Sequence, residues 1–269
     1  PNMGHKGERM RPLGMMVPCP LAAPAMLAAP GALAKAAAPE GGHCVAATPE
    51  GTGAYQGRSC LNAVGGTGKY NWAPEPGAKP GFEGQGEKVA LETTGKQKIT
   101  CAAATFAGKY TGPKTETVTM DLVGCILANG QKCQTVPPKE GEIEAELEGE
   151  LGYIVGGAKP LVGVDLKPKA PSTTFASFTC GKLPETAISA WTIEGSVIAP
   201  VKPYNHPVEE FKMAYKVALG KQAVEKFEGG PTDTLTAKIV SGLETKTEPI
   251  GLRMLRTDTN EELTEIKSK

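Results

Sequence analysis

The chain has 269 residues with 29 basic and 29 acidic side chains, so its formal net charge at pH 7 is zero. A neutral chain has no net electrostatic reason to bind nucleic acid or an anionic membrane surface, and we expect neither as a partner. Its length allows one large β domain or two small ones, with a sizeable core.

Residues 1–34 are predicted to be a leader. Three basic residues near the start precede an apolar stretch from Leu13 to Leu33, which closes on the A-x-A motif Ala32-Leu33-Ala34. This order is that of a secretory signal peptide, for which Met10 would be a natural start; the alternative is a disordered Ala/Pro tail without a targeting role. Four prolines interrupt the stretch, so we expect no membrane-spanning helix. The body is therefore expected to be secreted or to lie at the cell surface.

Residues 35–87 form a Gly/Pro-rich N-terminal segment with two cysteines, Cys44 and Cys60. The segment also holds an aromatic cluster of Tyr55, Tyr70 and Trp72. These rings either stack on sugars or on a partner, or they form the only core of the segment. The second interpretation is favoured, because a small segment must bury its aromatic side chains somewhere.

Six cysteines follow the leader: Cys44, Cys60, Cys101, Cys125, Cys133 and Cys180. An even number in an exported chain predicts a disulfide framework. A three-residue hairpin loop over 128–130, with Gly130 in the left-handed region, places Cys125 opposite Cys133 and predicts that pair. Cys44–Cys60 is the next most local choice, and it leaves Cys101–Cys180 as a long-range link. The cysteines lack the C-x₂-C spacing of zinc sites, so no metal site is predicted.

Residues 88–269 alternate apolar and polar side chains with a period of two, which predicts β-strands. The predicted strands are Val89–Leu91, Ile99–Ala103, 117–122, Glu142–Leu147, Leu161–Leu166, Thr174–Thr179, Ile188–Ala199, 211–219, Val224–Phe227, Leu235–Val240, Ile250–Leu255 and Leu263–Ile266. Their spacing predicts an all-β, mainly antiparallel body, either a sandwich or a barrel, with a division into two subdomains left open near residue 200. Residues 208–223 also fit one face of a helix, although the alternation favours a strand.

A search for catalytic motifs finds none. No serine after the leader lies in a G-x-S-x-G nucleophile elbow. The Gly-rich stretch Gly65–Lys69 lacks the remaining residues of a phosphate loop. The histidines after the leader, His43 and His206, have no identifiable catalytic partners, and Trp191 is expected in the core. We therefore predict no catalytic, cofactor-binding or metal-binding residue, although the many glutamates leave a glycoside hydrolase formally open.

Several segments together resemble a group of exported, uncharacterised bacterial β-rich proteins with paired cysteines. They are Leu91–Gly95, Ile99–Cys101, Tyr110–Lys114, Glu148–Ile154, Phe175–Gly181, Lys226–Pro231 and Asn260–Glu262. The resemblance implies export, a shared β fold and paired cysteines, and it assigns no activity.

Two functional hypotheses remain. The first is a non-enzymatic secreted or cell-surface β protein with a structural, assembly or adhesion role, whose partners are further copies of itself or cell-surface and polysaccharide components. The second is a secreted carbohydrate-binding module or glycoside hydrolase that uses Tyr55, Tyr70 and Trp72. A cleft with two nearby carboxylates and aromatic walls favours the second hypothesis; an apolar surface patch or a long unpaired edge strand favours the first.

Overall fold

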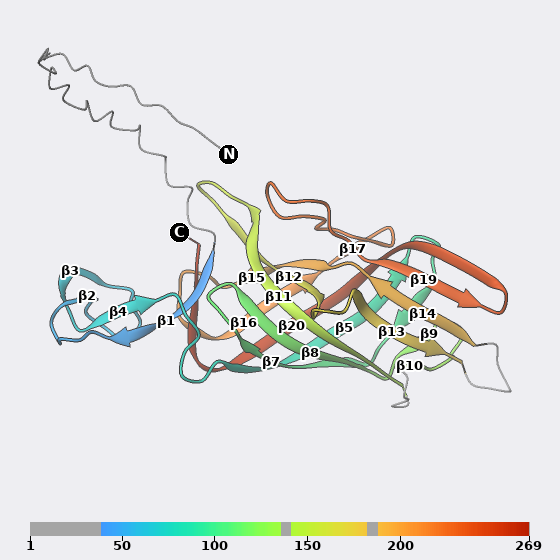
Figure 1. Ribbon diagram of the computed structural model, residues 1–269, viewed down its shortest axis with the longest axis horizontal. Coiled ribbons are helices and arrows are strands. Elements are labelled where there is room, and N and C mark those ends of the chain that lie inside the picture. Colours follow the sequence, from blue (N-terminus) through green and yellow to red (C-terminus); the bar gives the residue numbers. More distant parts are fainter. Residues whose placement is uncertain (1–38, 136–140, 182–187, 269) are drawn as a thin grey trace, which may run out of the picture. The chain divides into compact units, whose positions relative to one another are not determined.

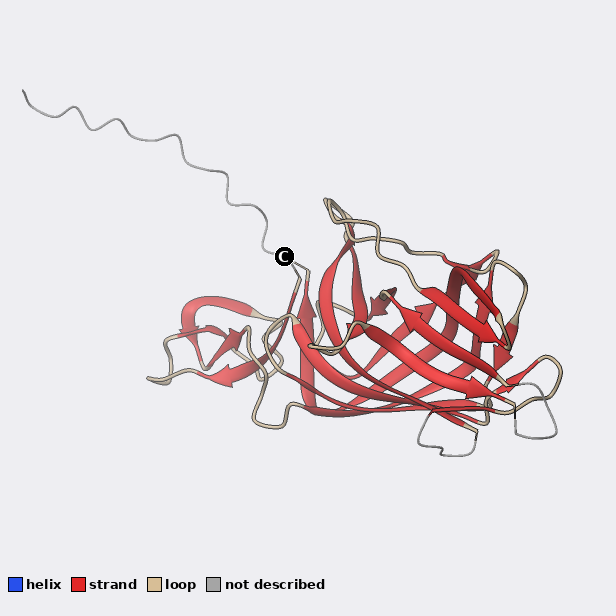
Figure 2. Ribbon diagram, turned by 45° about the vertical axis from the view of Figure 1, so that its right-hand side comes forward, coloured by secondary structure: helices blue, strands red, loops and turns tan. Residues whose placement is uncertain are grey.

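The computed structural model describes residues 39–135, 141–181 and 188–268, and all regular secondary structure in these ranges is β (Figures 1 and 2). The predicted all-β class is confirmed. The predicted leader, residues 1–34, lies outside the described residues. Within the described ranges, no helix has the length and apolar character needed to cross a bilayer.

Eight antiparallel strands close into a barrel, because each pairs with the next and the last pairs with the first. In barrel order they are β5 (Gly81–Thr93), β7 (Ala103–Tyr110), β8 (Thr115–Val123), β11 (Glu142–Val155), β12 (Leu161–Pro168), β15 (Val197–Lys202), β16 (Val208–Tyr215) and β20 (Glu244–Lys267). The body is thus a barrel rather than a simple sandwich. An eight-stranded barrel is just wide enough to be filled by side chains or to hold one small ligand.

A second sheet continues from the first part of β20, where residues 244–249 pair with β19. Its other strands are β19 (Thr236–Ser241), β14 (Ser189–Glu194), β13 (Thr174–Cys180) and β10 (Cys133–Thr135). Trp191 of β14 is 1% exposed and stacks on Phe178 with 5.8 Å between ring centroids, so its predicted core position is confirmed. Short strands β6 (Lys98–Thr100) and β9 (Ile126–Leu127) extend the barrel sheet beside β5.

A small sheet is formed by β1 (Glu40–Ala46), β2 (Gly53–Tyr55), β3 (Ala63–Gly68) and β4 (Tyr70–Ala73). Strand β1 joins it to the barrel, because residues 40–42 pair with the end of β20 and residues 43–46 pair with β4. The Cys44–Cys60 disulfide predicted from the sequence is confirmed. Residue 88, the expected domain boundary, lies inside β5, and residue 200 lies inside β15.

The barrel strands follow directly from the alternation in the sequence. In β11, Ile143, Ala145 and Leu147 are buried, whereas the glutamates between them are intermediate or exposed. Its neighbour β8 buries Val118, Met120 and Leu122 in the same way. Because successive side chains of a strand point to opposite faces, one face of each strand fills the barrel.

The segment that also fitted a helix is a strand from Val208 to Tyr215, which confirms the favoured interpretation. It is followed by a hairpin of β17 (Val217–Ala218) and β18 (Lys221–Gln222). Its two turn residues, Leu219 and Gly220, both have positive φ, as a type I′ hairpin turn requires.

Two other strand predictions are corrected. The run 188–199 is two strands, β14 and β15, separated at Gly195, whose φ is +96°. The run Val224–Phe227 is not a strand. Its aromatic side chain packs over Gly152 of β11, where a Cβ atom would lie 2.6 Å from the Phe227 ring. The segment is therefore held by packing against the barrel rather than by strand pairing.

The predicted Cys125–Cys133 disulfide is wrong, as is Cys101–Cys180. The bonds are Cys101–Cys125 and Cys133–Cys180, each with 4.0 Å between the Cα atoms. The predicted hairpin itself is present: Gly130 has φ +84°, and the Cys133 N–H donates to the Cys125 carbonyl at 2.9 Å. Cys125 and Cys133 thus lie opposite each other across the hairpin, while the Cys125 N–H donates to the Gly141 carbonyl at 3.0 Å.

Cys133 and Cys180 occupy a non-hydrogen-bonded position between β10 and β13. They are register partners, and the Gly181 N–H donates to the Lys132 carbonyl at 3.0 Å, just beside them. At such a position the side chains of opposed residues approach most closely. The correct hairpin register therefore placed two cysteines face to face, while each had a closer partner on another strand.

Candidate functional site

One end of the barrel contains a cavity of about 40 Å³. Residues of β1, the loop after β4, the β7–β8 turn and the end of β20 surround its mouth. Six apolar side chains also line it: Leu151, Val164, Val201, Phe211, Met213 and Ile266. A water molecule needs roughly 10–15 Å³ measured in this way, so the space suits a few waters or a slender aliphatic group.

Charged side chains form the floor of this cavity. In β20, Arg256 and Asp258 are two positions apart and therefore share the inward face. Glu116 of β8 reaches them from the opposite wall. The side chains of Arg256, Asp258 and Glu116 are 0%, 3% and 9% exposed. Two of these residues, Asp258 and Glu116, line the cavity, while Arg256 lies behind them.

Arg256 holds the two carboxylates unequally. Its Nε donates to Asp258 Oδ1 and its Nη2 lies beside Asp258 Oδ2, both at 2.7 Å. Glu116 Oε1 is 3.4 Å from the same Nη2. This bidentate pairing with Asp258 is the stronger contact, because two short charge-assisted hydrogen bonds fix it. The guanidinium also lies 4.5 Å from the ring centroid of Phe106 and 5.5 Å from that of Phe82.

Strand β11, which pairs with β8, makes room for the Glu116 side chain. Gly149 of β11 is the register partner of Glu116. A Cβ atom at Gly149 would lie 2.4 Å from Glu116 Cγ and 2.6 Å from Oε1. Any larger residue at this position would therefore have to displace the carboxylate from the floor.

Tyrosine and asparagine side chains complete the floor. The Tyr110 hydroxyl donates to Asn260 Oδ1 at 2.7 Å. Three buried polar atoms in this region have no hydrogen-bond partner among the described residues: Arg256 Nη1, the Tyr215 hydroxyl and Asn260 Nδ2. The described lining of the cavity includes none of these three residues, and the Tyr215 hydroxyl lies beside the Arg256 guanidinium, so these atoms belong to the packing around the floor.

Burial sets the proton chemistry of the floor. It raises the pKa of Glu116 to about 7, although Arg256 acts to lower it. The pKa of Asp258 is also raised by burial, against the opposing effect of Arg256. Burial acts to lower the pKa of Arg256, but Asp258 and Glu116 raise it overall, so the guanidinium stays charged. Glu116 is therefore the group that exchanges a proton near neutral pH.

The arrangement of the carboxylates favours a structural ion cluster over a hydrolytic pair. A glycoside hydrolase needs one protonated acid and one carboxylate free to attack or to activate water. Here both oxygens of Asp258 are bound by Arg256. Among residues 39–135, 141–181 and 188–268, no group of three or more His, Cys, Asp or Glu side chains is arranged to hold a metal ion.

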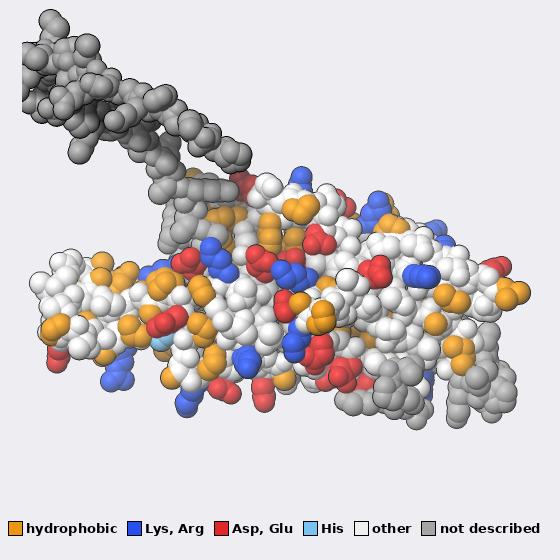
Figure 3. All heavy atoms as spheres, viewed as in Figure 1, with side chains coloured by type: hydrophobic (Ala, Val, Ile, Leu, Met, Phe, Trp, Pro, Cys, Tyr) orange, Lys and Arg blue, Asp and Glu red, His pale blue; other side chains and the backbone are white. Residues whose placement is uncertain are grey.

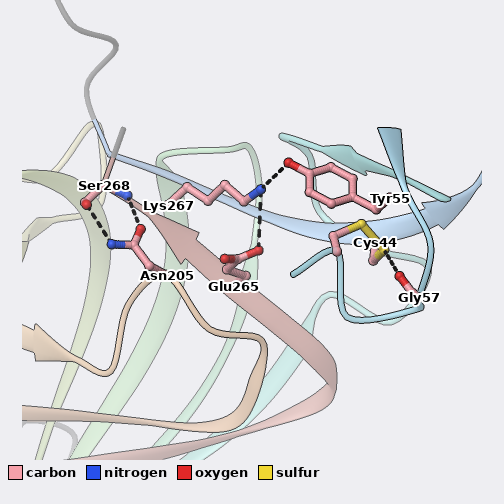
Figure 4. A network of polar contacts seen from close by, with 8 residues as sticks. Cys44, Tyr55, Gly57, Asn205, Glu265, Lys267 and Ser268 are labelled. Atoms are coloured by element: carbon pink, nitrogen blue, oxygen red, sulfur yellow. Dashed lines mark hydrogen bonds and ion pairs between the residues drawn. A yellow bond between two sulfur atoms is a disulfide. The ribbon is translucent and has the colours of Figure 1, made fainter. Parts of the chain in front are cut away.

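Of the three aromatic residues expected from the sequence, Tyr55 and Trp72 lie beside Lys267 at the end of β20, and Figure 4 shows Tyr55 there. The Lys267 ammonium is 4.9 Å from the ring centroid of Tyr55 and 4.6 Å from that of Trp72, and it donates to the Tyr55 hydroxyl at 3.2 Å. It also lies 3.8 Å from Glu265. Tyr70 points elsewhere and accepts a hydrogen bond from Arg58 Nε. Two of the three rings thus surround a lysine of the same chain.

The sequence search did not find the floor residues, although a signal for them exists. Leu252, Met254, Arg256 and Asp258 continue one alternating face of β20. Charged residues in place of apolar ones on this inward-facing set of positions are the sequence signal for the floor residues. The comparisons with known protein families, with curated proteins and with solved structures find no match for this chain. The site must therefore be interpreted from its own chemistry.

Proposed function

We propose that this chain is a non-enzymatic binding protein that takes up a small ligand with an apolar body in the open end of its barrel. The observation that carries the proposal is the cavity, with six apolar side chains in its lining and two buried carboxylates on its floor. Ligand sites typically combine a mainly apolar lining with a few convergent polar groups. The bidentate Arg256–Asp258 pair holds the floor in a fixed arrangement, as a binding site requires.

The three disulfides support a place of action outside the reducing cytosol, in agreement with the expected export. Charged side chains of both signs are interspersed over the face shown in Figure 3. A surface with both signs of charge interspersed is typical of a soluble protein that has low affinity for non-specific partners. We therefore propose a secreted or surface-held carrier or sensor rather than a hydrolase.

Methyl NMR of the oxidised protein tests the proposal. Short-chain aliphatic compounds are expected to produce saturable shifts of the Leu151 and Val164 methyl signals. Val164→Phe fills the cavity and should abolish the shifts of the Leu151 methyl signals, whereas Val240→Phe, at a partly exposed position of β19, should leave them unchanged. Absence of saturable shifts, or equal shifts in the cavity-filled variant, would refute the proposal.

Self-association is a second candidate, because two leucines stand fully exposed at hairpin tips. Leu219 lies in the β17–β18 turn and Leu243 in the β19–β20 turn. Exposed apolar residues at such positions can serve as contacts between copies. Light scattering should then show a concentration-dependent increase in mass that Leu219→Ser with Leu243→Ser removes. A monomer at all concentrations would exclude this role.

A further inference from the structure

The floor of the barrel cavity carries one more negative charge than positive charge when its carboxylates are ionised. Arg256 and Asp258 form a bidentate pair that neutralises itself. Glu116 is the surplus acid, held only by a contact of 3.4 Å to a nitrogen already used by Asp258. A buried carboxylate without a full partner is unfavourable and must either take up a proton or acquire a cation.

Three polar side chains next to Arg256 line the cavity and can accept hydrogen bonds from a ligand, whereas the donors of the lining belong to Thr115, Thr264, Lys114 and His43. Glu116 and Asp258 line it, whereas the donor between them, Arg256, does not. Tyr110 also lines it, and its own proton is committed to Asn260 Oδ1, which leaves the phenol oxygen as an acceptor. A ligand head group placed between Glu116, Asp258 and Tyr110 therefore meets hydrogen-bond acceptors from three side chains and needs donors of its own.

The mouth of the cavity has the same sign of charge. Glu75, Glu150 and Glu262 line it, against Lys114. Glu150 pairs with Lys167 at 2.8 Å, and Lys114 pairs with Glu40 at 3.6 Å. The remaining carboxylates, Glu75 and Glu262, make the entrance negative. Clefts lined by one sign of charge concentrate ligands of the opposite sign.

We infer that the ligand of this site is a cationic amine with a slender apolar body, its ammonium group bound between Glu116, Asp258 and Tyr110. This inference rests on the proposed binding function and specifies its ligand class. An ammonium group supplies three donors and one positive charge, which matches the acceptors and the surplus charge of the floor. The hydrocarbon part lies against Leu151, Val164 and Met213. A carboxylate ligand would face the repulsion of Glu116 and Asp258.

Binding should displace the proton of Glu116. At pH 7 the carboxyl group is about half protonated, since its pKa is about 7. An ammonium placed beside it favours the ionised form, so binding is expected to release about half a proton per ligand at this pH. Proton release distinguishes an ammonium at Glu116 from an apolar chain that merely enters the cavity.

The experiment is titration calorimetry of the full oxidised chain with hexylamine, hexanol and hexanoate, which share one chain length and differ only in the head group. Hexylamine is expected to bind at least about tenfold more tightly than hexanol, and hexanoate still more weakly. Titrations in buffers of different ionisation enthalpy should show the proton release. Glu116→Gln should remove both the preference for hexylamine over hexanol and the proton release.

A matched control is Glu146→Gln, because Glu146 lies exposed on the outside of the same barrel wall and should leave all three affinities unchanged. Binding of the three compounds with equal affinity, or an amine preference that survives in Glu116→Gln, would overturn the amine inference while supporting the binding function. Failure of all three compounds to bind would overturn both. Folding of Glu116→Gln is checked by its circular dichroism spectrum and its urea denaturation midpoint.

Discussion

Replacing Glu116 by glutamine is expected to make the folded protein more stable than the wild type at alkaline pH but not at acidic pH. Burial raises the pKa of Glu116 from 4.5 to about 7 in the native state, whereas the unfolded chain keeps the ordinary value. The stability that the protonated carboxyl contributes is fully present below pH 4.5 and is lost as the pH rises through 7. At about 1.4 kcal/mol per pKa unit, the wild type loses about 3 kcal/mol from this group.

Glutamine resembles the protonated carboxyl in shape and remains neutral at every pH. At pH 4.5 the variant and the wild type should have similar free energies of unfolding, and at pH 8 the variant should be more stable by about 1–3 kcal/mol. Urea denaturation at closely spaced pH values measures this difference. Asp165 and Glu265, whose pKa values burial also raises, titrate in both proteins, so the difference between the two curves reports on Glu116 together with Asp258 beside it.

Glu146→Gln is the control for this experiment. Its carboxylate is half exposed, and the hydrogen bond from Thr119 holds its pKa below the ordinary value. Loss of such a group should not stabilise the protein at alkaline pH. A stability difference between Glu116→Gln and the wild type that is the same at pH 4.5 and at pH 8 would refute the raised pKa and the surplus charge with it.

Four further expectations follow from the same structure. Arg256→Met leaves two buried carboxylates without a cation and should cost about 3–5 kcal/mol at pH 7, with partial recovery at acidic pH in urea denaturation. Gly149→Ala should destabilise the fold by about 1–3 kcal/mol, because its Cβ overlaps the Glu116 side chain; an unchanged midpoint would contradict this packing. Lys267→Met, compared with Lys267→Arg, should alter the tryptophan fluorescence of the small sheet and weaken the fold by about 1 kcal/mol. Peptide mapping should recover Cys133 linked to Cys180, and removal of that bond should cost about 4 kcal/mol on the chain-entropy model, more than the shorter disulfide loops.

The elements of this fold were readable from the sequence because the barrel strands bury one face only. Strand β11 alternates glutamate with Ile143, Ala145, Leu147 and Gly149, and the structure buries the second set. The two-residue period of apolar side chains then shows directly which face of the strand is turned towards the core. The ambiguous segment 208–215 follows the same rule, since Phe211, Met213 and Tyr215 all point inward.

The closure of the barrel was not readable, because it depends on which strands pair across long distances in the chain. Strand β20 is the main example: its first part joins the second sheet, and its later part pairs with both β5 and β16. The sequence showed it as two separate apolar runs, 250–255 and 263–266. Between them lie Thr257, Asp258 and Asn260, which interrupt the hydrophobic pattern while the strand continues.

The predicted disulfides Cys125–Cys133 and Cys101–Cys180 are wrong for a related reason. Local spacing gave the right hairpin at 128–130, and it gave the right bond for Cys44 and Cys60. It had no information about the neighbouring strands that carry Cys101 and Cys180. A register between two strands fixes which residues oppose each other, but a cysteine can also oppose another cysteine on a third strand, as Cys133 opposes Cys180, and the hairpin alone does not reveal that strand.

The polar residues that interrupt the hydrophobic pattern of β20 also form part of the candidate site. The interruption and the site have one cause. Apolar side chains at positions 256 and 258 would continue the barrel core and avoid the desolvation of three charged groups, which often makes a protein more stable. A chain that departs from its own pattern inside its core usually does so at a functional or strained position. In β20 the departure is confined to the inward face beneath the cavity, with Glu116 and Gly149 fitted to it on the opposite wall. The coordinated placement of an acid, a cation and a glycine on different strands is what the proposed ligand site would require, since stability alone would favour apolar side chains there.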